Sequence, residues 1–178
     1  MVRRRKIDDN IGSTRNLIFC KLENDSGDKP NRLCFISERL SVLKNISEAL
    51  ESLKQAIELD PNNSTALHLL GAMMNEQNSP ECIKFYEKCL EINNRSYLTY
   101  NGLGNFYLKT NQYEKAENYY TKAIEIDPKR SPKIYKNRAY LREKQNKNSD
   151  AKEDLKSYLK YFPQAPDRGI IEQAIREL

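Results

Sequence analysis

The amino-acid sequence predicts an all-α fold, a right-handed α-solenoid of helix–turn–helix repeats with a C-terminal capping helix. Three observations predict it. One 34-residue segment has apolar and small residues that recur in its neighbours, polar turns separate the helical segments, and prolines follow several of them. Because a single helix pair cannot bury its own apolar face, copies must stack, and we expect function on the surface that stacking creates.

The segment 97–130 carries the repeat pattern most completely. In its second half, Ala116, Tyr120 and Ala123 are spaced i, i+4 and i+7, which places them on one face of an α-helix. Pro128 cannot continue that helix and is expected to follow its end. The full pattern comprises Tyr100, Leu103, Gly104 and Tyr107 in the first helix, and Ala116, Tyr120, Ala123 and Pro128 in the second.

The same pattern recurs on both sides and divides the chain into repeats at 30–63, 64–96, 97–130 and 131–165. The second unit is one residue short and the fourth one residue long, and both differences can be placed in turns. In the first helices the equivalent positions are Leu33, Ile36, Ser37 and Leu40; Leu67, Leu70, Gly71 and Met74; and Tyr135, Arg138, Ala139 and Arg142. In the second helices they are Ala49, Leu53, Ala56 and Pro61; Cys82, Tyr86, Cys89 and Asn94; and Ala151, Leu155, Tyr158 and Pro163.

Residues 1–29 lack the pattern and are expected to form an N-terminal arm that is partly disordered or extended. They contain a basic run, Arg3–Lys6, an apolar patch, Leu17–Cys20, and the start of a loop-forming stretch that runs from Asn24 to Pro30. The patch could form a short strand on the first repeat. The basic run would suit nuclear import or nucleic-acid contact, although acidic residues follow it closely.

Residues 166–178 are expected to form the capping helix that covers the last repeat. Pro166 suits the first turn of a helix, and Asp167 suits its positive end. The expected apolar stripe consists of Ile170, Ile171, Ala174, Ile175 and Leu178.

These units resemble tetratricopeptide repeats, and the resemblance covers about three quarters of the chain. Two residues depart from the family pattern, because Arg138 and Arg142 stand at positions that are normally apolar. The resemblance implies a non-catalytic adaptor or assembly factor that binds another protein, through an extended peptide or acidic segment, in the concave groove lined by the first helices.

The family's groove positions fall on residues that could bind a peptide. An amide side chain both donates and accepts, so it can pair with a peptide backbone, and lysines beside it would favour an acidic residue or a C-terminal carboxylate. The alternative is that these polar residues simply face water, and for the histidine we expect a solvent-exposed side chain. The candidates are His68, Asn101, Asn105, Lys109, Lys133, Lys136, Asn137 and Tyr140.

Two alternative functions remain open. One is a co-chaperone that binds the C-terminal carboxylate of a heat-shock chaperone. Asn105 and Asn137 could match two asparagines of that clamp, but Asn101 stands where a lysine belongs and only Arg168 is near the third position. The other is an RNA-associated or regulatory subunit that uses the basic C-terminal half. Against RNA, its basic residues alternate with acidic ones, which is typical of a solvated helix face.

Composition argues against catalysis and against a cofactor. The chain has one histidine, no Cys-x-x-Cys pair, and no paired carboxylates, nucleophile–base pattern or phosphate loop. The cysteines Cys82 and Cys89 are too far apart on one helix to form a disulfide and are expected to be small buried residues in a reducing compartment. No secretory signal or membrane-spanning run is present, so we expect a cytoplasmic protein with no metal and no membrane partner.

Overall fold

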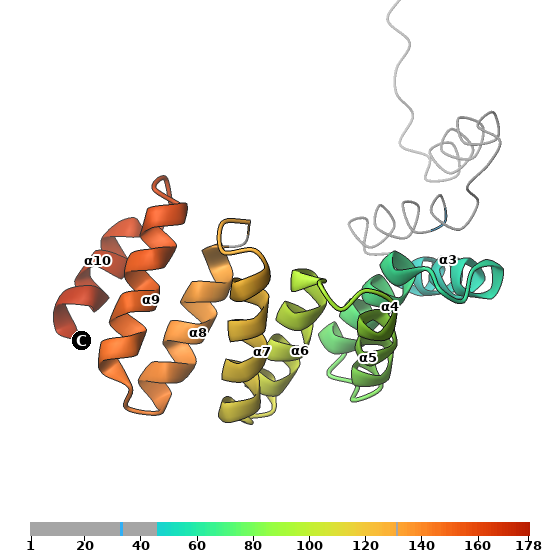
Figure 1. The fold of residues 1–178 in the computed structure, drawn as a ribbon, viewed down its shortest axis with the longest axis horizontal. Coiled ribbons are helices and arrows are strands. Elements are labelled where there is room, and N and C mark those ends of the chain that lie inside the picture. Colours follow the sequence, from blue (N-terminus) through green and yellow to red (C-terminus); the bar gives the residue numbers. More distant parts are fainter. Residues whose placement is uncertain (1–32, 34–45, 131) are drawn as a thin grey trace, which may run out of the picture.

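The computed structural model describes residues 33, 46–130 and 132–178, and within them it contains helices and no strand. Consecutive helices are joined by short turns into pairs, and the pairs stack side by side (Figure 1). The all-α helical-repeat solenoid predicted from the sequence is therefore confirmed. The helices are α3 (Ile46–Leu59), α4 (Ser64–Glu76), α5 (Cys82–Ile92), α6 (Tyr97–Lys109), α7 (Tyr113–Ile126), α8 (Pro132–Lys144), α9 (Asn148–Tyr161) and α10 (Arg168–Glu177).

Three helix pairs fall inside predicted repeats: α4 with α5 in 64–96, α6 with α7 in 97–130, and α8 with α9 in 131–165. The expected first helix of the first repeat, apart from Leu33, and the arm at 1–29 lie outside the described residues. The division of the chain at these bounds stays a prediction.

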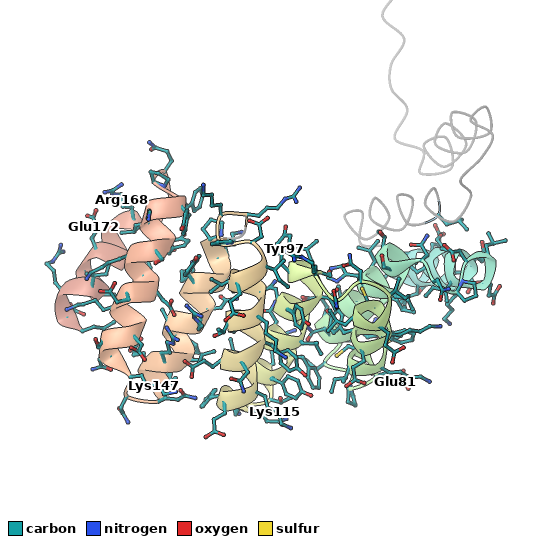
Figure 2. The ribbon with its side chains drawn as sticks, in the orientation of Figure 1. Glu81, Tyr97, Lys115, Lys147, Arg168 and Glu172 are labelled. Atoms are coloured by element: carbon teal, nitrogen blue, oxygen red, sulfur yellow. The ribbon has the colours of Figure 1, made fainter. Side chains whose placement is uncertain are left out.

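The turns within pairs and the connections between pairs lie along opposite edges of the solenoid. Glu81, Lys115 and Lys147 mark turns within pairs along one edge, and Tyr97 and Arg168 mark helix starts along the other (Figure 2). All first helices therefore run in one direction and all second helices run back. This arrangement repeats the same faces along the array, so equivalent positions of successive repeats lie next to each other.

Local sequence signals set the ends of the helices. The second helices α3, α7 and α9 each end two residues before a proline: Pro61, Pro128 and Pro163. Within the pairs, the turns contain an asparagine in the left-handed backbone region, which asparagine tolerates better than most residues. These residues are Asn78 (φ 56°), Asn111 (φ 58°) and Asn146 (φ 60°).

A tyrosine from each of two second helices lies against glycines of the first helices. A Cβ atom on Gly71 or Gly102 would come within 2.8 or 2.5 Å of the Tyr86 side chain, and one on Gly104 within 2.5 Å of Tyr120. Side chains larger than hydrogen at these glycines would therefore push the helices apart. The small residues of the pattern thus fix how closely neighbouring helices approach.

The terminal helix differs from its prediction in two details. It begins at Arg168, so Pro166 lies outside the helix, and the Asp167 carboxylate makes no capping hydrogen bond to it. The predicted apolar stripe is also wrong at one position, because Ile170 is 73% exposed whereas Ile171 is 7% exposed and packs with Tyr158 and Leu155. Ile171, Ala174, Ile175 and Leu178 face the core, and Ile170 lies at the edge of this face.

Replacing Ala116 with glutamate should destabilise the fold severely. Ala116 is 0% exposed in the cluster that also contains Tyr120 and Ala123, so the new carboxylate would be buried without a partner, at a cost of about 3 kcal/mol or more. Urea unfolding followed by circular dichroism measures this loss. The exposed Glu114→Ala variant serves as the control, and a mild effect of Ala116→Glu would contradict the helix packing described here.

Candidate functional site

The first helices α4, α6 and α8 contact one another directly through polar side chains. Between α4 and α6, Asn75 Nδ2 donates to the Gly102 carbonyl oxygen at 3.0 Å, and Lys109 Nζ donates to the Asn75 carbonyl oxygen at 3.0 Å. Between α6 and α8, Asn137 Nδ2 donates to Asn105 Oδ1 at 3.2 Å. These three helices therefore form one continuous surface, which we call the inner wall.

Two helical stripes make up the part of the inner wall on α6 and α8. Within each stripe the residues are three or four positions apart, so they share one face of their helix. The contact between Asn105 and Asn137 places the two stripes side by side. The stripe of α6 consists of Leu98, Asn101, Asn105 and Lys109, and the stripe of α8 consists of Lys133, Asn137, Tyr140 and Lys144.

Three asparagines lie on this surface, and we call them the amide row: Asn101, Asn105 and Asn137. They are not equivalent. Asn105 Oδ1 accepts hydrogen bonds from Asn137 Nδ2 and from the hydroxyl of buried Tyr120, the latter at 2.7 Å. Its own Nδ2 and the Oδ1 of Asn137 have no partner within the described residues. Asn101 Oδ1 is buried and accepts no hydrogen bond from the described part of the chain. The amide row therefore keeps hydrogen-bonding capacity that the fold leaves unused.

His68 is not the solvent-exposed residue that the sequence suggested. It is half-buried, with its ring centroid 5.8 Å from that of Tyr86 and its Nδ1 3.3 Å from Thr99 Oγ1. Burial lowers the pKa of His68 below 6.5, so the ring is neutral at physiological pH. The prediction missed this because the contact with Thr99 comes from the next repeat, which spacing within one helix does not reveal.

The candidate lysines differ in how far the fold already uses them. Lys109 donates to a backbone carbonyl, and Lys136 Nζ lies 2.7 Å from Asp167 Oδ2. Lys133 is exposed and has no ion pair among the described residues. Tyr140 is 51% exposed, and Lys144 Nζ lies 5.4 Å from its ring centroid. A partner therefore meets Lys133, Lys144 and the Tyr140 ring as available groups.

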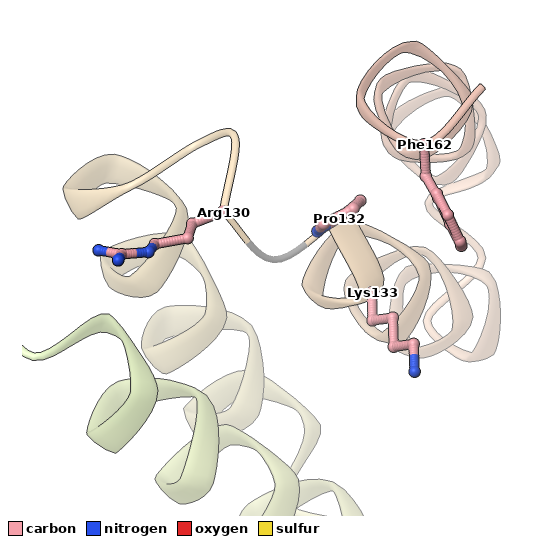
Figure 3. Close-up of a pocket in the computed structure, with 4 residues that line it drawn as sticks. All are labelled: Arg130, Pro132, Lys133 and Phe162. Carbon is pink, nitrogen blue, oxygen red and sulfur yellow. The ribbon is translucent and has the colours of Figure 1, made fainter. Parts of the chain in front are cut away.

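Beside Lys133 there is an open pocket of about 270 Å³ at the start of α8. Its lining also includes Arg130, Pro132 and Phe162, and Figure 3 shows the Arg130 side chain pointing away from the other three. The lining offers positive charge and apolar contact but no carboxylate, imidazole or thiol. It suits contact with a partner rather than proton transfer.

A buried ionic cluster occupies the two positions of α8 where the repeat pattern is normally apolar. Arg138 donates to both carboxylate oxygens of Asp154, at 2.9 and 2.6 Å, and Arg142 Nη1 donates to Asp154 at 2.9 Å. Arg142 Nε and Lys147 Nζ each lie 2.7 Å from Glu117. Burial alone would raise the pKa of Glu117, but the hydrogen bonds from Lys147 and Arg142 lower it overall. The two arginines thus join α7, α8 and α9 through paired charges, which the sequence pattern alone did not predict.

Neither a metal cluster nor a membrane-spanning helix is found in the parts of the chain described here. Over these residues, no three histidine, cysteine, aspartate or glutamate side chains gather as a metal site would require. None of the helices from α3 to α10 has the length and apolar character that crossing a bilayer demands. Cys82 and Cys89 are free and buried, as expected, and burial raises the pKa of both thiols.

Comparisons with known proteins match two segments of the chain to a known repeat family. Family models described as tetratricopeptide repeat match residues 97–130 and 40–63. The chain is 32% identical over 103 residues to anaphase-promoting complex subunit 3 of Schizosaccharomyces pombe. This match covers 57% of this chain and 16% of that protein. It is 33% identical over 87 residues to tetratricopeptide repeat protein 37 of Xenopus laevis, a match that covers 47% of this chain and 6% of that protein. The matched region is thus a small part of both relatives.

Solved structures share the fold at lower identity. PilF of Pseudomonas aeruginosa has a TM-score of 0.74 at 20% identity and covers 84% of this chain and 70% of its own. MamA of Desulfovibrio magneticus RS-1 has a TM-score of 0.68 at 18% identity and covers 90% of this chain and 99% of its own. These similarities establish the architecture and not the partner.

Replacing Asp154 with leucine should cost about 3–5 kcal/mol of stability, because it leaves the buried guanidinium of Arg138 without its carboxylate. The double variant Arg138→Leu/Asp154→Leu should regain most of this loss, since it also removes the unpaired charge. Urea unfolding measures both free energies, with exposed Glu153→Ala as the control. A double variant as unstable as Asp154→Leu would show that the pairing of these charges is unimportant.

Stability should also decline as the pH falls below 6.5 because of His68. Its pKa is lower in the folded state than the unfolded value of 6.5, so its contribution is full above that pH and is lost as protonation favours the unfolded chain. His68 is the chain's only histidine, so His68→Gln should flatten the pH profile between about 5 and 7. Thermal unfolding across this range tests it. Parallel profiles for wild type and variant would refute the assignment.

Proposed function

Because the chain is a tetratricopeptide repeat protein, we propose that it is a non-catalytic adaptor or assembly factor that binds an extended peptide segment of a partner along the inner wall. Repeats of this class indicate a protein–protein interaction module in general. The peptide, its path over α4, α6 and α8, and the residues it contacts are our proposal.

The observation that carries the proposal is the unused hydrogen-bonding capacity of the amide row. Asn101 Oδ1 is buried without a donor, and an unsatisfied buried acceptor costs about 1–3 kcal/mol. Asn105 Nδ2 and Asn137 Oδ1 are left over after the contact between these two side chains. An extended peptide backbone offers N–H and C=O groups in alternation, so it can pair with Asn105 Nδ2 and Asn137 Oδ1 whatever its side chains, and with Asn101 once that buried side chain turns outward.

The groups beside the amide row favour an acidic segment. Lys133 and Lys144 lie on the same stripe of α8 as Asn137, and the half-exposed Tyr140 lies between them on that stripe. Residues 97–178 contain sixteen basic and eleven acidic residues, a net charge of +5. A partner with negative charge would therefore be attracted to this half of the chain.

The sequence relatives support a role in assembly. One of them is named as a subunit of a complex. The likeness supports an adaptor that holds proteins together without saying which proteins these are.

The co-chaperone alternative gains less support. The two asparagines of a carboxylate clamp, Asn105 and Asn137, are bonded to each other, and Asn101 stands where the clamp needs a lysine. For RNA, many cations of the basic half are already paired with acidic side chains, which lowers the charge available to phosphates. These paired cations are Lys136, Arg138, Arg142, Lys147, Lys156 and Arg168. A cytoplasmic location stays part of the proposal.

The test replaces inner-wall residues that the fold does not need. In Asn101→Ala/Lys133→Ala/Tyr140→Ala, each lost contact should cost about 1 kcal/mol or more, so the affinity for the partner should fall about a hundredfold. Affinity purification with tagged wild type and variant, quantified by mass spectrometry, measures the loss.

A control carries three alanine substitutions on the second helices instead: Lys84→Ala/Asn118→Ala/Lys156→Ala, all exposed on α5, α7 and α9. This variant should retain the wild-type partners. If the inner-wall variant also retained them all, groove binding would be wrong, and the outer face or the arm would become the place to search.

A further inference from the structure

The end of the inner wall contains a carboxylate held by two donors from different helices. Asp167 Oδ2 accepts from Lys136 Nζ of α8 at 2.7 Å, and Asp167 Oδ1 accepts from the hydroxyl of Tyr158 of α9 at 2.7 Å. Lys136 Nζ also lies 5.4 Å from the Tyr158 ring centroid. The two donors thus face the same point, one for each oxygen of a single carboxylate.

Asp167 reaches this point from outside the two donor helices. It precedes α10, where an aspartate side chain commonly caps the helix, but it makes no such hydrogen bond here. Its carboxylate instead accepts hydrogen bonds from Lys136 of α8 and Tyr158 of α9. The donor pair is therefore built by the last repeat, and the connection to α10 supplies only the group that fills it.

We propose that Lys136 and Tyr158 form a carboxylate-binding site at the end of the inner wall, and that the chain's own Asp167 occupies this site until a partner's carboxylate replaces it. The ligand is the carboxylate of an aspartate or glutamate side chain, or of a chain terminus. The site differs from the amide row because it uses an ammonium and a phenol and no asparagine.

The exposure of the pair permits exchange. The side chains of Lys136 and Asp167 are 40% and 25% exposed, and ion pairs open to solvent are weak and readily replaced. The terminal helix does not depend on the carboxylate alone, because Ile171 is buried against α9, together with Ala174, Ile175 and Leu178. Asp167 can therefore leave its donors while α10 remains packed.

The protonation states suit this role. Hydrogen bonds from Lys136 and Tyr158 lower the pKa of Asp167, so its carboxylate is ionised at neutral pH. Burial, followed by the bond to Asp167, raises the pKa of Tyr158 to about 12, so its phenol remains a neutral donor. Any carboxylate of ordinary pKa could take the place of Asp167 without a change of protonation.

The consequence for partner binding rests on the proposed function, but the site itself does not. Lys136 precedes Asn137 of the amide row in α8, so a peptide lying along the row reaches the site at one end. A partner must then compete with Asp167, which lowers its apparent affinity by the fraction of molecules in which Asp167 is bound. Asp167 thereby favours partners that place a carboxylate at this position.

The experiment empties the site and refills it without any partner. In Asp167→Ala, sodium acetate should raise the unfolding midpoint by about 2–4 °C over sodium chloride at equal ionic strength. Wild type should show no such difference. N-acetylglycine, which presents a terminal carboxylate, and N-acetylaspartate α-amide, which presents a side-chain carboxylate, distinguish the two natural sources, and acetamide is the neutral control.

Two further variants identify the site. Lys136→Met/Asp167→Ala should lose the response to acetate, whereas Lys156→Met/Asp167→Ala, altered at an exposed lysine of α9, should keep it. If Asp167→Ala does not fold alone, its refolding yield in acetate and in chloride provides the same comparison. Equal effects of acetate and chloride on Asp167→Ala, or an equal response to acetate in wild type, would overturn the proposal. Because these measurements contain no partner, they stand or fall separately from the test of groove binding.

Discussion

The close approach of first helices to the tyrosines of the second helices sets the geometry on which the whole array depends. Tyr86 lies against Gly71 and Gly102, which belong to different repeats, and Tyr120 lies against Gly104. A single ring therefore fixes both the spacing within one helix pair and the distance to the next pair. This contact also holds the first helices close enough for their polar side chains to meet across the repeats.

The polar groups of the inner wall consequently form some of their hydrogen bonds with one another. Asn75 and Lys109 join α4 to α6, Asn105 and Asn137 join α6 to α8, and Lys136 joins α8 to the segment before α10. Groups that a family resemblance assigns to ligand binding are thus also structural links. Under the proposed function, a partner would use the hydrogen-bonding capacity that is left over after these links.

The joint between the third and fourth repeats is held by charge as well as by apolar packing. Arg142 of α8 pairs with Glu117 of α7 across the joint and shares the Asp154 carboxylate of α9 with Arg138. Ile134 and Leu141 of α8 pack with Tyr120 of α7. Burying ions is costly unless every partner is present, so such a cluster tolerates few alternative registers. The joint therefore combines apolar packing with paired buried charges.

The sequence alone determined the helical-repeat fold, because the spacing of small and apolar residues and the positions of prolines act within each helix. It also placed the amide row on a common surface. Tertiary structure decided which polar side chains of the inner wall already have partners within the fold. His68 is buried by Tyr86 and Thr99, and Lys136 is paired with Asp167. Within the described residues, Asn101 and Asn75 each keep a buried side-chain oxygen without a donor. The reason is physical: a helix face follows from local periodicity, whereas the partner of a polar group comes from another repeat, 27 to 34 residues away in the inner-wall contacts between α4 and α6.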